Sequence, residues 1–299
     1  MLIGLNNIAI INPRRTFMNS DSENWSEIIS PKKTLFHLNL KELWDYRDLI
    51  WIFVKRDIIS VYKQTLLGPI WFFLGPIFTV ITFTFVFSGI AHLSTDNIPA
   101  PLFYLAGTTM WNYFQSCFTG TSSTFVSNAS IFGKVFFPRL ISPISLILSN
   151  LLKFSIQLLM FLVFWVYYWH EGSISPNYYL LLLPLLILLM GGIALGTGII
   201  VSALTTKYRD LNYFISFGIS LLMYATPVIY PVSAIPALYK PLVIYNPISP
   251  IIETFRFGFT GSGYFSWGGL FYSSLFMSVI LIIGILLFNK IERTFMDTV

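Results

Sequence analysis

Long, uninterrupted apolar runs recur along the chain, separated by short polar stretches. They cover residues 66–91, 102–126, 140–169, 178–206, 211–230 and 270–289. A helix that spans a bilayer needs about 20 apolar residues, whereas half-buried strands alternate apolar and polar positions. Because these runs are continuous, the pattern predicts six transmembrane helices and no strands.

A different pattern precedes the first run, at residues 41–65. Polar and charged residues recur there at helical spacing, and apolar residues line the opposite side. The polar side comprises Lys41, Asp45, Asp48, Lys55, Arg56, Ser60, Lys63 and Gln64. This pattern is typical of an amphipathic helix that lies in the membrane interface with its cations toward lipid headgroups. A break at Gly68-Pro69 then leads directly into the first apolar run.

Composition supports a membrane protein. The chain has 299 residues, of which 55% are hydrophobic and only 10% are charged, whereas soluble domains carry about 25% charged residues. The sequence therefore predicts an all-α, polytopic membrane protein and excludes an ordinary soluble domain. Since no basic patch stands apart from the membrane flanks, no nucleic-acid partner is expected. The single cysteine, Cys117, lies in an apolar run and is interpreted as a packing residue.

The placement of cations predicts the orientation. Lys and Arg precede the first run and occupy the second-to-third connection, the fourth-to-fifth connection and the tail. These residues are Arg14, Arg15, Lys32, Lys33, Lys41, Arg47, Lys55, Arg56, Lys63, Lys134, Arg139, Lys207, Arg209, Lys290 and Arg293. The loops at 92–101 and 170–177 hold neither. The positive-inside rule places both termini in the cytoplasm. Residues 1–35 are expected to form a loosely ordered cytoplasmic extension, and residues 36–299 the transmembrane domain.

The segment 232–269 is interrupted by prolines at positions 236, 241, 247 and 250, and neither of its apolar pieces is long enough to cross a bilayer. It is interpreted as a re-entrant pair of short helices before the last span, entering from the outer side. Glu253 and Arg256 are three residues apart and could pair on one helical turn. Such a pair suggests a hydrated place near the exit of a pathway. The alternative is an ordinary outer loop that rests on the surface.

Signatures of an enzyme or of an intrinsic energy source are missing from the sequence. Gly133-Lys134 lacks the other residues of a phosphate-binding loop, and the three histidines are scattered. Carboxylates lie almost wholly outside the apolar runs, which argues against a proton-driven carrier. We therefore expect a transport subunit rather than an enzyme, with no cofactor in this chain and with energy supplied by a separate nucleotide-hydrolysing subunit.

The connection at 127–139 is a candidate docking element for such a partner. Polar residues that can cap a helix are followed by apolar and aromatic residues around a lysine, and Pro138 ends the segment. A short exposed helix with an aromatic face and a basic residue suits a groove on another protein. The residues that carry this hypothesis are Ile131, Phe132, Lys134, Val135, Phe136 and Arg139. The alternative is a helix that lies flat on the bilayer.

Two features inside the apolar runs remain. A lysine in mid-span costs about 2.5 kcal/mol or more unless it finds water or a partner, so Lys153 is expected to face a pathway, a dimer seam or an internal partner. Gly191, Gly192, Gly196 and Gly198 contain a pattern of small residues four apart. That pattern favours close helix packing over ligand binding.

Several local motifs occur in a familiar order. They are residues 62–71, Phe137-Pro138-Arg139 followed by Ser142-Pro143, residues 207–211, residues 226–230, and residues 246–250 with Glu253 and Arg256. Taken together over residues 40–299, they resemble the membrane subunits of ABC-2-type polysaccharide exporters, the group that moves O-antigen, capsule and wall teichoic acid chains. The extension at 1–35 is longer than this family leads one to expect.

The resemblance implies a homodimer in the bacterial inner membrane with two copies of a separate ATP-binding subunit, which would hold ATP and Mg. It implies export of a lipid-linked glycan, with residues 131–138 as the coupling helix. Lys55, Arg56 and Lys63 would lie at the cytoplasmic entrance, near a pyrophosphate of the cargo, and Lys153, Glu253 and Arg256 along the pathway. The alternatives are an ABC-2 permease that exports a drug or lipid, and a membrane-embedded glycan or acyl transferase.

Overall fold

The computed structural model describes residues 40–63, 70–135, 137–207 and 210–295, and within these ranges every regular element is a helix. The predicted all-α fold class is therefore confirmed. The elements are α1 (Leu40–Asp45), α2 (Arg47–Lys63), α3 (Trp71–Phe83), the π-helix η2 (Thr84–Ile90), α4 (Ala100–Ser122), α5 (Thr124–Ser127), α6 (Ala129–Phe132), α7 (Ile141–His170), η3 (Tyr178–Leu182), α8 (Leu183–Lys207), α9 (Leu211–Tyr224), η4 (Val232–Ala234), α10 (Lys240–Ile244), α11 (Ser249–Thr260) and α12 (Trp267–Phe295). The extension at 1–35 lies outside the described residues.

Among the described residues, four helices are long and apolar enough to cross a membrane, which indicates a multi-pass membrane protein. They cover Phe73–Ile90, Ile141–His170, Tyr178–Thr205 and Trp267–Lys290. The helix α4 has 23 residues but carries many polar side chains. The helix α9 has 14 residues, or about 21 Å at 1.5 Å per residue, against a hydrocarbon core of about 30 Å. Six crossings therefore remain a prediction.

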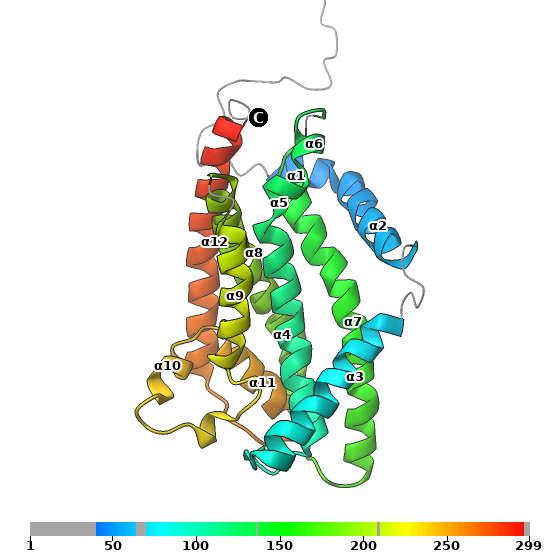
Figure 1. Cartoon of the computed structure of the whole chain (residues 1–299), viewed down its shortest axis with the longest axis vertical. Coiled ribbons are helices and arrows are strands. Elements are labelled where there is room, and N and C mark those ends of the chain that lie inside the picture. The colour runs from blue at the N-terminus through cyan, green and yellow to red at the C-terminus, as the bar shows by residue number, and fades with distance from the viewer. Residues whose placement is uncertain (1–39, 64–69, 136, 208–209, 296–299) are drawn as a thin grey trace, which may run out of the picture. The chain divides into compact units, whose positions relative to one another are not determined.

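The long helices run lengthwise beside one another, with α8 packed between α4 and α12 (Figure 1). Glycines on α8 permit this packing. A Cβ at Gly196 would lie 2.7 Å from Ile280 Cγ2 of α12, and one at Gly198 would lie 2.7 Å from Thr121 Cβ of α4. At such distances one helix would have to move. The interpretation of these glycines as close-packing residues is confirmed.

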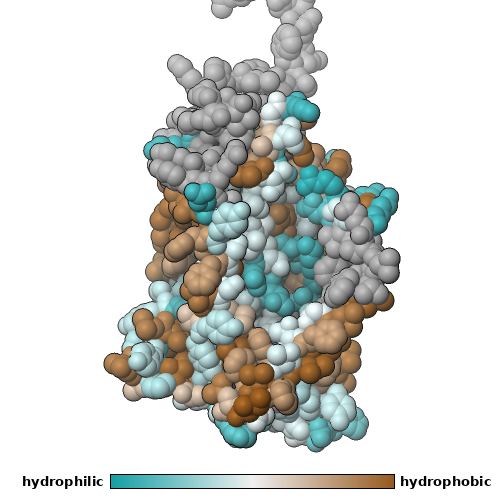
Figure 2. All heavy atoms as spheres, in the orientation of Figure 1, coloured by the Kyte–Doolittle hydropathy of each residue, from teal (hydrophilic) through white to brown (hydrophobic). Residues whose placement is uncertain are grey.

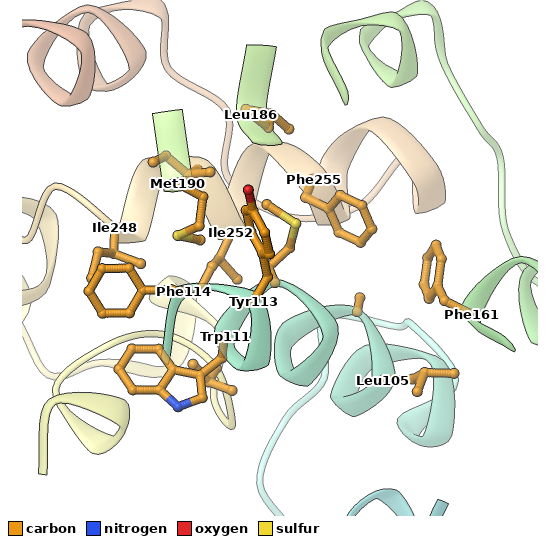
Figure 3. Packing of buried hydrophobic residues seen from close by; sticks show 14 of the residues in the cluster. Leu105, Trp111, Tyr113, Phe114, Phe161, Leu186, Met190, Ile248, Ile252 and Phe255 are labelled. Atoms are coloured by element: carbon orange, nitrogen blue, oxygen red, sulfur yellow. The ribbon is translucent and has the colours of Figure 1, made fainter. Parts of the chain in front are cut away.

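Two apolar clusters hold the bundle together. The larger one surrounds α4, where Trp111 and Phe114 meet Ile248 and Ile252, the latter from α11 (Figure 3). The smaller one lies at the end of the bundle that carries α5 and α6, called the α6 end below. It comprises Phe53, Phe125, Phe132, Phe137, Ile141, Ile199 and Phe288. Phe53 of α2 packs edge-on against Phe137, with ring centroids 5.7 Å apart, so α2 is joined to this cluster.

The segment between α9 and α12 leaves and rejoins the bundle at the opposite end, called the α11 end (Figure 1). It contains the two short helices α10 and α11, as predicted. Ten of the twelve residues of α11 are buried, so a loop that merely rests on the surface does not describe this helix. Gly261 ends α11 with φ +75°, a conformation in which a Cβ would collide with the carbonyl of Ser175. Whether α11 reaches membrane depth stays a prediction.

Candidate functional site

A polar cleft of about 710 Å³ lies between α2, α4 and α7, toward the α6 end. Figure 2 shows hydrophilic residues gathered in a hollow of this face, between brown apolar surfaces. Three apolar or glycine residues and thirteen polar ones line it: Ile131, Leu146 and Gly120, with Arg56, Asp57, Ser60, Gln115, Ser116, Thr119, Ser123, Ser127, Asn128, Ser142, Ser149, Asn150 and Lys153. Ligand pockets are usually lined mostly by apolar side chains, so this composition is unusual for a protein that is 55% hydrophobic.

The amphipathic pattern of α2 creates one wall. Phe53 and Val54 are buried toward the protein, and Arg56, Asp57 and Ser60 follow on the side that faces the cleft. Arg56 donates from Nε and Nη2 to Asp57 Oδ1, at 3.0 and 2.8 Å. Its guanidinium also lies 4.7 Å from the ring centroid of Phe53, a cation–π contact. The position of the guanidinium is therefore fixed at the edge of the cleft.

A second wall comes from α7, which carries polar residues at helical spacing in an apolar run. The O–H of Ser149 is shared between the carbonyl of Ser145, at 2.9 Å, and Asp57 Oδ2, at 3.4 Å, so a weak contact links α7 to α2. Lys153 Nζ donates to Asn150 Oδ1 at 3.1 Å, one turn earlier on the same helix. Within the described residues this is the sole hydrogen bond of Lys153, and no carboxylate lies within salt-bridge distance. An ammonium group has three donors, so two of them have no protein partner among the described residues.

The third wall is α4, and its polar side chains are less satisfied than those of α7. Gln115, Ser116 and Thr119 make no side-chain hydrogen bond to any described residue, whereas Ser123 donates to the carbonyl of Thr119 at 3.2 Å and to that of Gly120 at 3.1 Å. Sequence analysis missed this row. Its signal was the recurrence of Gln115, Thr119 and Ser123 at four-residue spacing inside the second apolar run.

The cleft brings together two predicted site residues from different groups. Arg56 was assigned to the cytoplasmic entrance and Lys153 to the pathway, and both line the cleft. Lys55 and Lys63 are exposed and do not line it. With two cations against one carboxylate, the cleft has an excess of positive charge. Its hydroxyl and amide groups both donate and accept hydrogen bonds, so the arrangement suits a hydroxylated ligand that carries negative charge.

Glu253 and Arg256 lie elsewhere, at the α11 end. They form the expected ion pair, with Arg256 Nη1 2.9 Å from Glu253 Oε1 and exposed fractions of 1% and 2% for the two side chains. Both side chains are buried within the chain, so the pair is not exposed as an open, hydrated site would be. Arg256 also donates from Nη1 to the carbonyl of Pro227 at 2.6 Å and from Nη2 to that of Val228. Through these carbonyls the pair cross-links α11 to the segment that follows α9.

The ion pair also contacts α4 and the loop that precedes α12. The guanidinium carbon of Arg256 lies 3.8 Å from the ring centroid of Phe103 of α4. Glu253 Oε2 accepts a hydrogen bond from the backbone N–H of Tyr264 at 3.2 Å. Gly107 of α4 makes room for this arrangement, because a Cβ there would lie 2.5 Å from both Arg256 Nη2 and the carbonyl oxygen of Val228.

The predicted coupling segment is more buried than expected. Its helix α6 covers only Ala129–Phe132, and Phe132, Phe137 and Arg139 are buried. The guanidinium of Arg139 lies 5.6 Å from the ring centroid of Phe132. The expectation of an exposed aromatic face is therefore wrong for Phe132 and Phe137, because these rings belong to the smaller apolar cluster.

The remaining residues of that segment differ in their surroundings. Lys134 and Val135 are exposed, Ile131 is half-buried and lines the cleft, and Phe136 lies outside the described residues. No group of three metal-ligating side chains occurs in the part of the chain that the structure describes. The coupling role stays a prediction, with Lys134 and Val135 as its accessible residues.

The fold and the cleft define a helical multi-pass membrane protein with a hydrophilic recess in an apolar body. The family model of the ABC-2 type transporter matches residues 48–260, which is more than half of the chain. The chain therefore belongs to the ABC-2 type transporter membrane family, and the family resemblance of its motifs is confirmed.

Curated relatives cover most of the chain. The O-antigen export system permease protein RfbA of Klebsiella pneumoniae is 29% identical over 252 residues, or 84% of this chain and 94% of that protein. RfbA of Myxococcus xanthus is 29% identical over 219 residues, or 73% and 82%. The polysialic acid transport protein KpsM of Escherichia coli is 23% identical over 247 residues, or 81% and 93%.

Proposed function

We propose that this chain is the membrane-spanning permease subunit of an ATP-driven exporter that moves a lipid-linked polysaccharide across the bacterial inner membrane. The observation that carries the proposal is the family match together with three similar permeases named for polysaccharide or O-antigen transport, each aligned over more than four fifths of its own length. The polar cleft supports it, since a chain of sugars needs hydroxyl and amide partners that lipid does not supply.

The functional unit is proposed to be a homodimer with two copies of a separate ATP-binding subunit, which would hold ATP and Mg²⁺. The printed sequence has no phosphate-binding loop, which supports hydrolysis in a separate subunit. The helix α9 exposes Tyr213, Phe214 and Phe217, with exposed fractions of 83%, 75% and 61%. Such an apolar face requires lipid or a second copy of the chain as its neighbour.

The α6 end is proposed to face the cytoplasm, as the positive-inside rule predicts for the connection that holds Lys134 and Arg139. In this orientation α2 lies at the cytoplasmic entrance, where Lys55, Arg56 and Lys63 would meet the anionic part of the cargo. The exposed residues Lys134 and Val135 would contact the ATP-binding subunit. The pair Glu253 and Arg256 would stabilise the outer end of the pathway rather than line it.

The proposal is tested by co-expressing the chain with its candidate ATPase, purifying the complex in detergent and measuring ATPase activity and glycan export. We expect a stable complex whose ATPase depends on the permease. Val135→Asp should weaken the complex because it places a carboxylate on an exposed apolar contact, whereas Ser173→Asp, at an exposed position of the loop after α7 and far from the α6 end, should not. No complex with the ATPase, or no loss of export when the permease is removed, would overturn the proposal.

A further inference from the structure

We propose that the cleft between α2, α4 and α7 is a binding site for an anionic group flanked by hydroxyl groups, with Lys153 as its principal cation. The chemical class is a sugar phosphate or an acidic sugar within the exported chain. This inference rests on the proposed function, because it assigns the part of the cargo that the permease recognises. It adds a site that the family match does not provide.

The state of Lys153 is the first observation. It lies at the thirteenth position of a 30-residue apolar helix, where a cation is expensive unless it is hydrated or paired. The protein supplies one amide oxygen, from Asn150 at 3.1 Å. Buried Arg256 is held by more partners, since it has a carboxylate and two carbonyls. Lys153 therefore retains donors that an anion in the cleft would accept.

The opposite wall is the second observation. Gln115, Ser116 and Thr119 of α4 make no side-chain hydrogen bond within the described ranges, although they line the same space. Hydroxyl and amide groups that are not used to hold helices together are available to a ligand. A simple inorganic anion would need only the cation. A row of neutral polar groups across from it fits a ligand whose anionic group is surrounded by hydroxyls.

The third observation is the position of Asp57. Its carboxylate accepts from Arg56 at 2.8 Å and from Ser149 at 3.4 Å, so it is occupied by the protein's own groups. Asp57 thus fixes Arg56 at the edge of the cleft and leaves Lys153 as the cation that has no ion-pair partner there. The volume of about 710 Å³ falls in the range of sites for small molecules. It has room for part of a sugar chain.

The experiment measures binding to the permease–ATPase complex in nanodiscs of phosphatidylcholine, with glucose 1-phosphate as the soluble probe. We expect saturable binding by calorimetry, weakened at least tenfold by Lys153→Gln and largely retained by Lys153→Arg, which keeps the charge. Lys240→Gln removes an exposed lysine of α10 outside the cleft and serves as the matched control, with unchanged affinity. Ser116→Ala should weaken binding by a smaller factor, about twofold to fivefold.

A second arm separates the two sources of such a ligand. Phosphoglycerol headgroups share the chemistry, so the complex is also studied in nanodiscs that contain phosphatidylglycerol. If phosphatidylglycerol binds the complex in a Lys153-dependent manner and glucose 1-phosphate does not bind, the assignment of the site to the cargo would be overturned. Wild-type affinity in Lys153→Gln would overturn the site itself. A complex that forms, hydrolyses ATP and exports glycan normally with Lys153→Gln would also refute this inference, while the proposed function would stand.

Discussion

Two ion pairs of the described residues, Glu253 with Arg256 and Asp57 with Arg56, have opposite surroundings. At the α11 end, Glu253 and Arg256 have exposed fractions of 2% and 1%, whereas Asp57 and Arg56 in the cleft have 26% and 44%. The ion-pair distances are nearly equal, 2.9 and 2.8 Å. The difference therefore lies in the surroundings, and the surroundings decide what each pair contributes.

A charge that is buried in protein needs neighbouring groups that accept its hydrogen bonds or balance its charge. Around Arg256 the chain supplies two backbone carbonyls and the ring of Phe103. Gly107 leaves room for the guanidinium because it has no side chain. Removing one partner from such a pair leaves an uncompensated buried charge. Around Lys153 the chain supplies one amide and a row of unused polar groups. A group that the protein leaves unsatisfied in an open cleft is available to solvent or ligand, so we expect the first pair to be structural and the cleft to bind a ligand.

The largest effect is expected for Arg256→Ala. The variant strands the Glu253 carboxylate in the interior and releases two carbonyls, which should cost about 3–5 kcal/mol. Thermal unfolding of the purified permease in detergent measures it, and the midpoint should fall by many degrees or the protein should fail to accumulate. An unchanged unfolding midpoint would show that the pair is solvated. The proposed difference between this pair and the charged residues of the cleft would then be wrong.

The double variant Glu253→Gln with Arg256→Met is the control for that experiment. It removes both charges while keeping similar volumes, so no unpaired ion remains. We expect the double variant to be more stable than Arg256→Ala. If the two lose equal stability, the lost hydrogen bonds to the carbonyls of Pro227 and Val228, which neither variant can make, account for the loss rather than the unpaired charge.

Gly107→Ala should give the next largest effect. Its Cβ would lie 2.5 Å from Arg256 Nη2 and from the backbone oxygen of Val228, so the backbone after α9 must shift, at a cost of about 1–3 kcal/mol. The matched variant Gly75→Ala in α3 meets nothing within 4 Å and should be neutral or slightly stabilising. Equal midpoints for the two variants would contradict the tight fit around Arg256.

Much of the fold was predictable because its signals are local. Continuous apolar runs predict helices, and the prolines between residues 232 and 269 predict the short helices α10 and α11. The pairing of Glu253 with Arg256 follows from their spacing on one turn. The close packing of α8 follows from its glycines.

The environment of these residues was not predictable, because it depends on neighbours that are distant in sequence. The sequence alone suggests that Arg256 is a hydrated charge, because it does not show that the carbonyls of Pro227 and Val228 lie beside this side chain. The sequence alone suggests that Phe132 is a docking side chain, whereas the structure shows that it packs against Phe125 and Phe137. The cleft combines residues that are 92 positions apart, such as Asp57 and Ser149. Without known contacts, the polar residues of α4 read only as interruptions in an apolar run.

Asp57→Asn directly tests the more exposed ion pair, which is formed by Arg56 and Asp57. Ion pairs with solvent-exposed members contribute about 0–1 kcal/mol, so the unfolding midpoint should change far less than in Arg256→Ala. The link between α2 and α7 through Ser149 should persist, because an amide oxygen still accepts a hydrogen bond. A loss of stability comparable with that of Arg256→Ala would show that the cleft is a structural centre rather than a binding site.

The smallest change in stability is expected for Ser116→Ala, and this variant separates the two roles most cleanly. Ser116 is exposed on α4 and makes no side-chain hydrogen bond to the described residues, so its loss should alter stability by no more than about 0.5 kcal/mol. Glycan export by the complex should nevertheless slow, because one hydroxyl partner of the cargo is removed. Ser278→Ala, an exposed serine of α12 outside the cleft, should leave both quantities unchanged. Export at the wild-type rate in Ser116→Ala would mean that the polar row of α4 only solvates the cleft.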